Sequence, residues 1–541
     1  MAARPASIIA LPPARWGLAL LAVAFLVPGL FGHDPWKTDD AIGIGIVHSI
    51  FDRGAWLTLE LAGEHYYEDG PLYYWFAAIL AKGASFFMPV HDGARLATLI
   101  SMATALYFTR LAARELYGKR AGDLSLLALL GSLGLLVHGH EVTAETAMLG
   151  ALAVAYYGIA IAWKKPIKAG ICFGLGTGCA FLAKGLIAFI PPLLAAIILM
   201  PVAYLKGTRS FNYAVLLGFL ILFPVAFTWP ATIAIADPEY FAGWVAWQWN
   251  HIVPAPSLSV SIDYLKILAW AAWPAWPLAL WATWEFRGNL ANPRFATPLV
   301  ASLVSVAMVI TNQSSRELDA LALLVPLAIP AGSAAIGLRR GAANALAWFS
   351  LMTFSLIAIA IWLFWIASQT GFPPRMAASV TRLEPGFLAT FNAFAVSCAA
   401  LFSIAWIWFV RRAELSTLRA LPFWAGGVIL TWGLTMTLWI DWIDYGKTYR
   451  PVVESIAAYV RAEEGCLASR GLGEAQRAVF HYHGGILTRR AEIDRGATCP
   501  YLLVQTTSID SEEYPDIEWL RVYEGARPRD KERYWLFRRL D

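Results

Sequence analysis

Apolar runs of about 20 residues recur along most of this chain, and they restrict its fold more than any other feature. A helix of that length crosses the hydrocarbon core of a membrane. Only 15% of the residues are charged, against about 25% in soluble domains, so a soluble enzyme of this length is excluded. We predict an all-α polytopic membrane protein with about 13 transmembrane helices. The expected spans are 15–33, 94–113, 121–138, 144–163, 167–183, 186–205, 212–234, 263–285, 295–311, 318–337, 343–368, 387–410 and 421–440.

One further apolar run, 72–88, could be either a membrane span or an interfacial helix. The distribution of Lys and Arg decides between the two, because cytoplasmic loops collect basic residues. If 72–88 lies in the membrane interface, one alternating set of loops holds most of the cations, including Lys164, Lys165 and Lys206, and the opposite set holds few. The N-terminus is then inside and the C-terminus outside. We expect the first helix to be retained, because no small-residue cleavage site follows it.

The composition changes near residue 445, where charged residues become frequent. We predict a membrane domain over 1–444 and an outer, periplasmic α/β domain over 445–541, with helices at 451–462 and 473–483 and strands at 501–505, 518–523 and 534–538. Cys466 and Cys499 either form a disulfide, which an oxidising compartment favours, or remain two buried thiols. The net charge of +4 is too small to indicate nucleic-acid binding.

With this topology, acidic and histidine side chains collect at the outer ends of the helices. Asp39 and Asp40 either cap a helix over 41–53 or present a carboxylate as general base or metal ligand. Lys184 and Arg316 either reach head groups and cap a turn, or bind a phosphate. The remaining polar residues of the outer loops fit either metal ligands or a solvated loop; they include His138, His140, Glu141, Glu145, Glu68 and His251.

The order of these motifs resembles that of the GT-C glycosyltransferases related to protein O-mannosyltransferases, and above all the bacterial transferases that add aminoarabinose to lipid A. The run 39–41 (Asp-Asp-Ala) is similar to the family's Asp-Glu-Ala. The run 67–75 (Tyr-Glu-Asp-Gly-Pro-Leu-Tyr-Tyr-Trp) is similar to its Phe/Tyr-Glu-Lys-Pro-Pro-Leu-Tyr-Tyr-Trp. The runs 181–185, 249–251 and 315–330 resemble its Leu-Thr-Lys-Gly, Glu-His and Lys/Arg-Glu-x-Tyr-x-x-x-Pro-x-x-Pro motifs, so the resemblance extends along the whole chain.

The resemblance implies an integral-membrane glycosyltransferase that takes a sugar from a polyprenyl-phosphate carrier, such as undecaprenyl phosphate. The acceptor would be lipid A, another glycolipid, a polysaccharide or a protein on the periplasmic face of a bacterial inner membrane. A phosphate leaving group needs cationic stabilisation more than protonation. The acceptor needs a carboxylate base, and without a covalent intermediate the sugar inverts its configuration. We expect the enzyme to be a monomer.

The resemblance also assigns roles to single residues. Asp39 matches the family's catalytic Asp and is the expected base, and Asp40 is a second acid or a helix cap. Glu145 would orient the acceptor or the first carboxylate. Lys184 and Arg316 match cations that face the carrier phosphate. Glu68 and His251 match a pair that binds zinc in the aminoarabinose transferase, so a divalent metal, Zn or Mg/Mn, is the cofactor to test.

Three positions depart from the family pattern, and each removes a cation from the phosphate side. Asp69 stands where the family has Lys, His140 where it has Arg, and Pro254 where an Arg commonly follows the His. Specificity for aminoarabinose or lipid A therefore does not carry over. Two other classes stay open: a transporter of polyprenyl lipid or solute, and a catalytically inactive relative that binds polyprenyl lipid.

Overall fold

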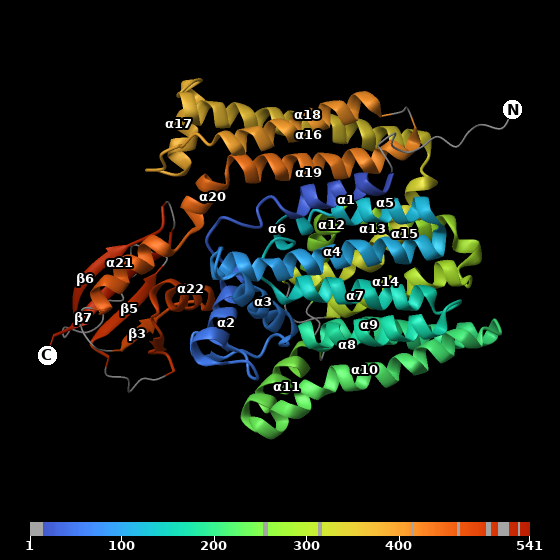
Figure 1. The fold of residues 1–541 in the computed structure, drawn as a ribbon, viewed down its shortest axis with the longest axis horizontal. Coiled ribbons are helices and arrows are strands. Elements are labelled where there is room, and N and C mark those ends of the chain that lie inside the picture. The colour runs from blue at the N-terminus through green and yellow to red at the C-terminus, as the bar shows by residue number, and fades with distance from the viewer. Residues whose placement is uncertain are drawn as a thin grey trace.

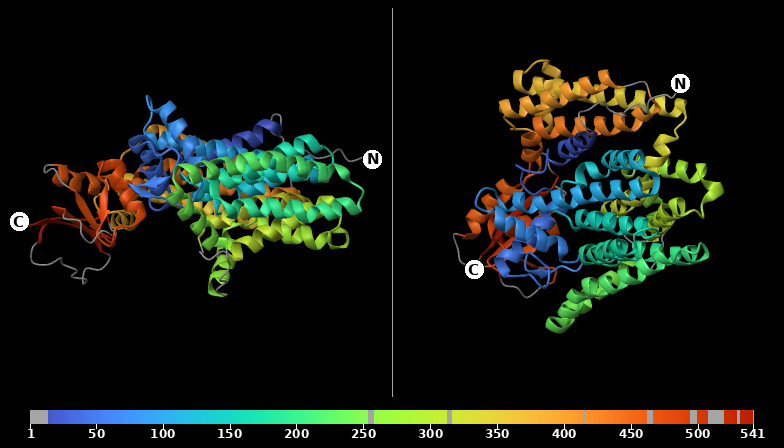
Figure 2. Two further views of the ribbon diagram at one scale, coloured as in Figure 1. Left: turned by 90° about the horizontal axis from the view of Figure 1, so that it is seen from below. Right: turned by 45° about the vertical axis from the view of Figure 1, so that its right-hand side comes forward.

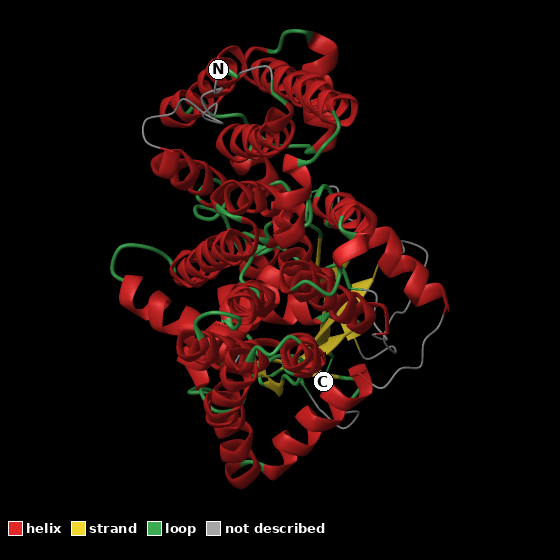
Figure 3. Cartoon of the chain, turned by 90° about the vertical axis from the view of Figure 1, so that its right-hand side faces the viewer, coloured by secondary structure: helices red, strands yellow, loops and turns green. Residues whose placement is uncertain are grey.

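The long helices of the chain run side by side, and a smaller unit with a β-sheet lies at one end of them (Figure 1). The computed structural model describes residues 14–252, 258–311, 316–413, 416–461, 466–493, 499–506, 519–528 and 531–540. Viewed from below, the sheet-containing unit extends beyond the helical bundle (Figure 2). In the end-on view, the strands gather in one small region behind the bundle (Figure 3).

Among the described residues, ten helices are long and apolar enough to cross a membrane, which makes the chain a multi-pass membrane protein. They match ten of the expected spans. These helices are α4 (Val90–Tyr117), α7 (Ala144–Ile161), α8 (Pro166–Lys184), α9 (Leu186–Leu205), α10 (Arg209–Ala236), α14 (Pro293–Thr311), η2 with α15 (Leu318–Leu323 and Leu324–Ile336), α16 (Arg340–Thr370), α18 (Ala393–Arg412), and η3 with α19 (Thr417–Arg419 and Ala420–Leu438).

The other three expected spans are shorter or broken. The first is α1 (Ala14–Leu26). The second divides into α5 (Lys119–Leu130) and α6 (Leu135–His138), and the third into α12 (Leu258–Ala271) and α13 (Ala275–Glu285). The break before α13 contains Pro274, which lacks a backbone N–H to continue the helix. Glycines 131 and 134 flank the break before α6, and glycine lowers the helix propensity there.

Several short elements lie outside the ten long helices. The helix α3 (Leu72–Ala84) is 13 residues, which is roughly 20 Å and too short to cross the hydrocarbon core, as expected for an interfacial helix. Between α2 and α3, the strands β1 and β2 form a small antiparallel hairpin whose turn has positive φ at Ala62 (50°) and Gly63 (84°). The remaining short elements and the hairpin strands are α2 (Asp39–Arg53), β1 (Glu60–Leu61), β2 (Glu64–His65), α11 (Pro238–Ile252), η1 (Arg287–Asn289), α17 (Pro374–Leu383) and α20 (Ile440–Lys447).

The C-terminal region forms a five-stranded sheet in the order β4-β3-β5-β7-β6. The strands β4, β3 and β5 are parallel, and β7 is antiparallel to both β5 and β6. Cys466 and Cys499 form a disulfide with their Cα atoms 5.0 Å apart. The elements are α21 (Arg450–Arg461), β3 (Leu467–Arg470), α22 (Glu474–Gly484), β4 (Thr488–Arg490), β5 (Tyr501–Thr506), β6 (Trp519–Gly525) and β7 (Arg533–Arg539).

The C-terminal unit packs directly against α2, and this contact places the candidate site. Residues of α2 such as Ile44 and Val47 share one buried apolar cluster with Phe480 of α22. The backbones approach so closely that a Cβ on Gly45 would lie 2.6 Å from the Cβ of Ala478, so only glycine fits there. Figure 1 shows α2 and α22 side by side. The helix that begins at Asp39 is therefore fixed by the C-terminal unit as well as by the membrane helices.

Candidate active site

The expected site residues occupy the ends of separate elements, all on the side of the bundle that faces the C-terminal unit. Asp39 lies in the first turn of α2, and Glu145 lies in the first turn of α7. Lys184 is the last residue of α8, and Arg316 precedes η2. Glu68 belongs to the loop before α3. Helix ends present side chains at a common level of the membrane, which explains how distant parts of the chain can meet here.

The loop before α3 is pressed against the end of α8. The backbone N–H of Gly70 donates to the carbonyl of Ala183 at 3.0 Å. A Cβ on Gly70 would lie 2.1 Å from the carbonyl oxygen of Leu182, so no larger residue fits without moving the backbone. The amide of Gln248 in α11 donates to the carbonyl of Glu68 at 3.3 Å. These contacts hold Glu68 and Asp69 beside Lys184.

Lys184 is surrounded by carboxylates. Its Nζ lies 2.5 Å from Asp69 Oδ1, 2.7 Å from Glu145 Oε1 and 3.1 Å from Glu68 Oε1. The lysine side chain is only 3% exposed. Asp69 also accepts a hydrogen bond from Tyr74 at 2.6 Å. A buried ammonium needs such counter-charges, and here its charge is already neutralised by the protein.

Arg316 joins Asp39 to this group. Its Nη2 lies 3.0 Å from Asp39 Oδ1, and its Nη1 forms an ion pair with Glu68. Glu68 thus contacts both Lys184 and Arg316. We call the connected set the carboxylate–cation cluster; it consists of Asp39, Glu68, Asp69, Glu145, Lys184 and Arg316. Asp39 and Arg316 form its accessible end, with side chains 24% and 34% exposed.

The two residues of the expected metal pair, Glu68 and His251, make other contacts in this arrangement. Glu68 contacts two cations, whereas the His251 ring stacks on Trp247 and its Nδ1 lies 3.2 Å from the Trp247 carbonyl. Among the described residues, the one group of three with metal-ligand spacing is Glu68, Asp69 and Glu145, whose ligand atoms lie within 4.8 Å of one another. Because the Lys184 ammonium contacts all three, a metal would have to displace it. A metal role for Glu68 and His251 stays a prediction.

Asp40 belongs to a separate buried network centred on Arg95 of α4. Asp40 is 1% exposed and pairs with Arg95 Nη2 at 2.7 Å, while its other oxygen accepts the Val142 N–H at 2.8 Å. Burial by itself would raise the pKa of Asp40, but the charges of Arg95 and His33, together with hydrogen bonds from Arg95 and the Val142 N–H, hold the pKa below its ordinary value. The carboxylate therefore joins the start of α2 to the segment before α7.

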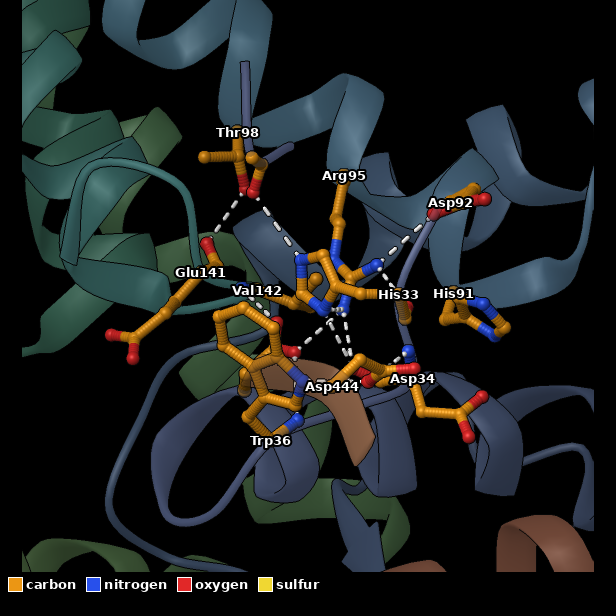
Figure 4. Close-up of polar contacts among 12 residues, drawn as sticks. His33, Asp34, Trp36, His91, Asp92, Arg95, Thr98, Glu141, Val142 and Asp444 are labelled. Carbon is orange, nitrogen blue, oxygen red and sulfur yellow. Dashed lines mark hydrogen bonds and ion pairs between the residues drawn. The ribbon is translucent and has the colours of Figure 1, made fainter. Parts of the chain in front are cut away.

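Arg95 also binds the backbone that leads to α2. Its guanidinium donates to the carbonyls of His33 at 2.8 Å and Asp34 at 3.2 Å, and it pairs with Asp92 at 3.0 Å. Figure 4 shows Arg95 between His33 and Asp92. The sequence analysis missed this residue, although an arginine within an apolar span is itself a signal, because a charge there needs buried partners.

The polar residues at 138–141, before α7, divide between two environments. His138 Nδ1 lies 2.7 Å from Glu141, and its Nε2 lies 3.5 Å from Glu317. The two ring nitrogens of His140 lie 3.1 Å and 2.9 Å from the carbonyl oxygens of Leu136 and Phe25, and the one that carries the proton donates to its carbonyl. His140 therefore contributes to the packing of the helices and does not contact the carboxylate–cation cluster. Pro254, the third departure from the family pattern, lies outside the described residues.

The helix bundle also contains an apolar groove of about 530 Å³. Its lining comes from α3, α4, α7 and α8 and includes Leu72, Trp75, Ile79, Ile100 and Val154. Leu72 follows Asp69 by three residues in the sequence, and Ala147, another lining residue, follows Glu145 by two. The arrangement combines an accessible carboxylate, an accessible guanidinium and an apolar channel, which suits a lipid with an anionic head.

Parts of this chain are similar in sequence to known proteins. The family model for dolichyl-phosphate-mannose-protein mannosyltransferase matches residues 68–229. An undecaprenyl phosphate-alpha-4-amino-4-deoxy-L-arabinose arabinosyl transferase 1 of Pseudomonas fluorescens is 25% identical over 242 residues, 42% of each chain. Its counterpart in Pseudomonas paraeruginosa is 25% identical over 372 residues, 64% of each. This chain thus spans under two thirds of the curated relatives' length.

Among solved structures, the crystal structure of ArnT from Cupriavidus metallidurans bound to undecaprenyl phosphate aligns with a TM-score of 0.69 and 17% identity. The alignment covers 97% of this chain and 98% of that one. The apo form of the same protein aligns with a TM-score of 0.65. At this identity the likeness concerns the fold, and it confirms the expected helical membrane fold with a C-terminal α/β unit.

Proposed function

We propose that this chain is a GT-C glycosyltransferase that transfers a sugar from a polyprenyl-phosphate carrier to an acceptor at the periplasmic face of the membrane. The observation that carries the proposal is the pair of Asp39 and Arg316 at the accessible end of the cluster. A polyprenyl chain would lie in the groove and its phosphate beside the guanidinium. The bound undecaprenyl phosphate in the structure of the similar ArnT supports this choice of carrier.

Arg316 is the group that contacts the donor phosphate. It is a third exposed, whereas Lys184 is almost fully buried and contacts three carboxylates. A guanidinium can bind two phosphate oxygens at once, and it is already charged before the sugar leaves. The expected role of Lys184 at the phosphate stays a prediction that requires it to release a carboxylate. In the present arrangement Lys184 positions Asp69 and Glu145.

Asp39 is the general base. When the donor phosphate engages Arg316, the Asp39 carboxylate loses that partner and becomes free to accept the proton of the acceptor hydroxyl. The acceptor oxygen forms a bond to the anomeric carbon as the bond from that carbon to the phosphate oxygen breaks. The bond electrons leave with the polyprenyl phosphate, whose charge Arg316 stabilises. A single displacement of this kind inverts the anomeric configuration.

Asp40 and Glu145 act as positioning residues. Asp40 is sealed in the Arg95 network and fixes the start of α2, from which Asp39 projects. Glu145 is 2% exposed and pairs with Lys184, so it supports the loop that carries Glu68. The proposed membrane domain of 1–444 thus supplies the reacting groups, and the proposed domain of 445–541 braces α2.

The site faces the periplasm in this proposal, because the opposite helix ends carry the basic residues Lys164, Lys165 and Arg209. Cysteine labelling tests the orientation. In whole cells, an impermeant thiol reagent should label Arg538→Cys, which is exposed on β7, and should not label Lys119→Cys, which is exposed at the other end. The reverse pattern would place the site in the cytoplasm.

One observation favours a second function, an inactive relative that binds polyprenyl phosphate without transfer. The cluster holds four carboxylates against two cations, which is unfavourable for a phosphate. Turnover separates the two functions: purified protein is supplied with a panel of radiolabelled polyprenyl-phosphate sugars and an envelope lipid extract. The transferase should release polyprenyl phosphate, whereas binding without release by any donor would establish the inactive relative.

The role of Arg316 is tested in the same assay. Arg316→Gln should raise the donor KM by roughly 10-fold or more, because a charge-assisted hydrogen bond is lost. Arg316→Lys should recover part of the loss. The matched control is Arg382→Gln, an exposed arginine at the end of α17. Equal donor KM values for all three variants and the wild type would remove Arg316 from the phosphate site.

A further inference from the structure

A second apolar groove lies between α16, α18 and α19, and its volume is about 470 Å³. These helices form one edge of the bundle, where α19 separates α16 and α18 from the rest of the protein (Figure 1). Most side chains of α16 and α18 are exposed, so the groove opens towards the lipids of the membrane. We call it the peripheral groove. No residue of the carboxylate–cation cluster lines it.

The floor of the peripheral groove is apolar because its polar side chains bind one another. The indole N–H of Trp362 in α16 donates to the hydroxyl of Ser403 in α18 at 3.0 Å. In the opposite direction, the indole N–H of Trp406 in α18 donates to the hydroxyl of Ser355 in α16 at 3.1 Å. Apart from Arg411, the other lining residues are apolar. With its indole donors satisfied, this surface suits a hydrocarbon chain.

One end of the peripheral groove is positively charged. Arg411 lines the groove near the end of α18, and its side chain is exposed. Among the described residues, none forms a hydrogen bond or ion pair with Arg411. The segment 411–419 holds three arginines and one acid, Glu414. Because α19 begins here and leads through α20 to the C-terminal unit, the charged end lies opposite the candidate active site.

The dimensions of the groove match one leaflet of a membrane. The helix α18 has 20 residues, or about 30 Å, which is the thickness of the hydrocarbon core, so Arg411 lies at the level of the lipid headgroups. The lining of α16 extends from Leu351 to Leu363, a rise of about 18 Å, and one leaflet of the core is about 15 Å deep. Leu351 shares an apolar cluster with Phe409, so the groove begins beside Arg411. A single acyl chain fits this depth.

We propose that the peripheral groove binds an anionic phospholipid of the leaflet opposite the candidate active site, with an acyl chain along its floor and the headgroup beside Arg411. This inference is independent of the proposed transferase function. Basic pockets between transmembrane helices bind the headgroups of anionic lipids, and a guanidinium pairs with two phosphate oxygens at once. A zwitterionic lipid carries an ammonium group that offsets its phosphate, so the excess of arginines selects a lipid with net negative charge.

Native mass spectrometry of the full-length protein in an uncharged detergent tests the selection. The protein is mixed with equal amounts of a phosphatidylglycerol and a phosphatidylcholine that have the same acyl chains. Phosphatidylglycerol should bind several-fold more tightly. Arg411→Gln should raise its dissociation constant roughly 5-fold, the effect of one arginine at a membrane surface, and Arg411→Lys should raise it less. The control is Arg120→Gln, an exposed arginine in the first turn of α5, which should bind like the wild type.

A second variant tests the floor of the groove separately from its charge. Ala358 lines the groove, so Ala358→Phe should fill it and weaken phosphatidylglycerol binding while Arg411 stays in place. Ala360 of the same helix does not line the groove, and Ala360→Phe is the control. Equal affinity of the wild type for the two lipids, or wild-type affinity for phosphatidylglycerol in either Arg411→Gln or Ala358→Phe, would overturn the proposal. The same spectra report oligomers: a dimer that Ala358→Phe dissociates would instead assign the groove to a second copy of the chain.

Discussion

Replacement of Lys184 by Met tests whether the carboxylate–cation cluster is a buried charge network that the protein must keep neutral. The methionine retains much of the length of the side chain and removes the ammonium. Asp69 and Glu145, each 2% exposed, would lose their common counter-charge, and Glu68 would keep only Arg316. Removal of one partner from a buried ion pair costs about 3–5 kcal/mol. We expect the free energy of unfolding to fall by an amount in this range. It should not fall by three such amounts, one for each carboxylate that contacts Lys184, because Asp69 keeps its hydrogen bond from Tyr74.

The assay is the free energy of unfolding of the purified protein in detergent, measured for a complete double-mutant cycle with Asp69→Asn. In the double variant one of the stranded negative charges is gone, so part of the loss should be recovered, with a coupling energy of about 0.5–3 kcal/mol. Lys168→Met is the control, since Lys168 is exposed in the first turn of the same helix. Its effect should stay within about 0.5 kcal/mol. A Lys184→Met variant as stable as this control would refute the network.

Three further predictions concern the parts that surround the site. Arg95→Met should destabilise the protein by about 3–5 kcal/mol, as judged by unfolding in detergent, because Asp40 and Asp92 lose a buried partner; Arg114→Met, at the exposed end of the same helix, should have little effect. Cys466→Ser with Cys499→Ser should make the C-terminal unit about 2–4 kcal/mol less stable, measured by limited proteolysis, and an equal cleavage rate would contradict a structural role of the disulfide. Burial lowers the pKa of His48 in α2 and of His483 in α22 to about 4, so the folded state binds fewer protons than the unfolded state and stability should fall as pH decreases from about 6.5 towards 4. Thermal unfolding at pH 7 and pH 5 checks this, and His48→Asn should reduce the difference between the two.

Periodicity and charge predicted the bundle well because membrane helices obey one strong constraint, the thickness of the bilayer. The interfacial assignment of 72–88 came from the loops' cations, and α3 is indeed too short to span. Breaks inside apolar runs, as at Pro274, were missed. Hydropathy measures only how apolar the side chains are, and it does not register the loss of a backbone N–H that ends a helix. The strands β3 and β4 were also missed, since runs of four and three residues carry almost no alternation.

The candidate site was predicted as a set of residues and not as a set of contacts. Loop order and topology place Asp39, Glu68, Glu145, Lys184 and Arg316 on one face, and the structure brings them together. The partner of each charge depends on side-chain packing, which no sequence pattern specifies. In the sequence, Asp69 was noted only because it stands where the family has a cation. In the structure, its carboxylate makes the shortest contact with the Lys184 ammonium. Asp40 and Asp39 are adjacent in sequence, yet one is sealed against Arg95 and the other is accessible.

The central claim, that Asp39 accepts the acceptor's proton, is tested most directly by the chemical step in Asp39→Asn. The variant keeps the shape of the side chain and removes its basicity. Single-turnover transfer from a polyprenyl-phosphate sugar should slow by roughly 10²–10⁴-fold, the usual effect of losing a general base, while donor affinity changes little. Asp441→Asn in α20 is the control and should transfer at the wild-type rate. Transfer by Asp39→Asn at the rate of this control would contradict the account.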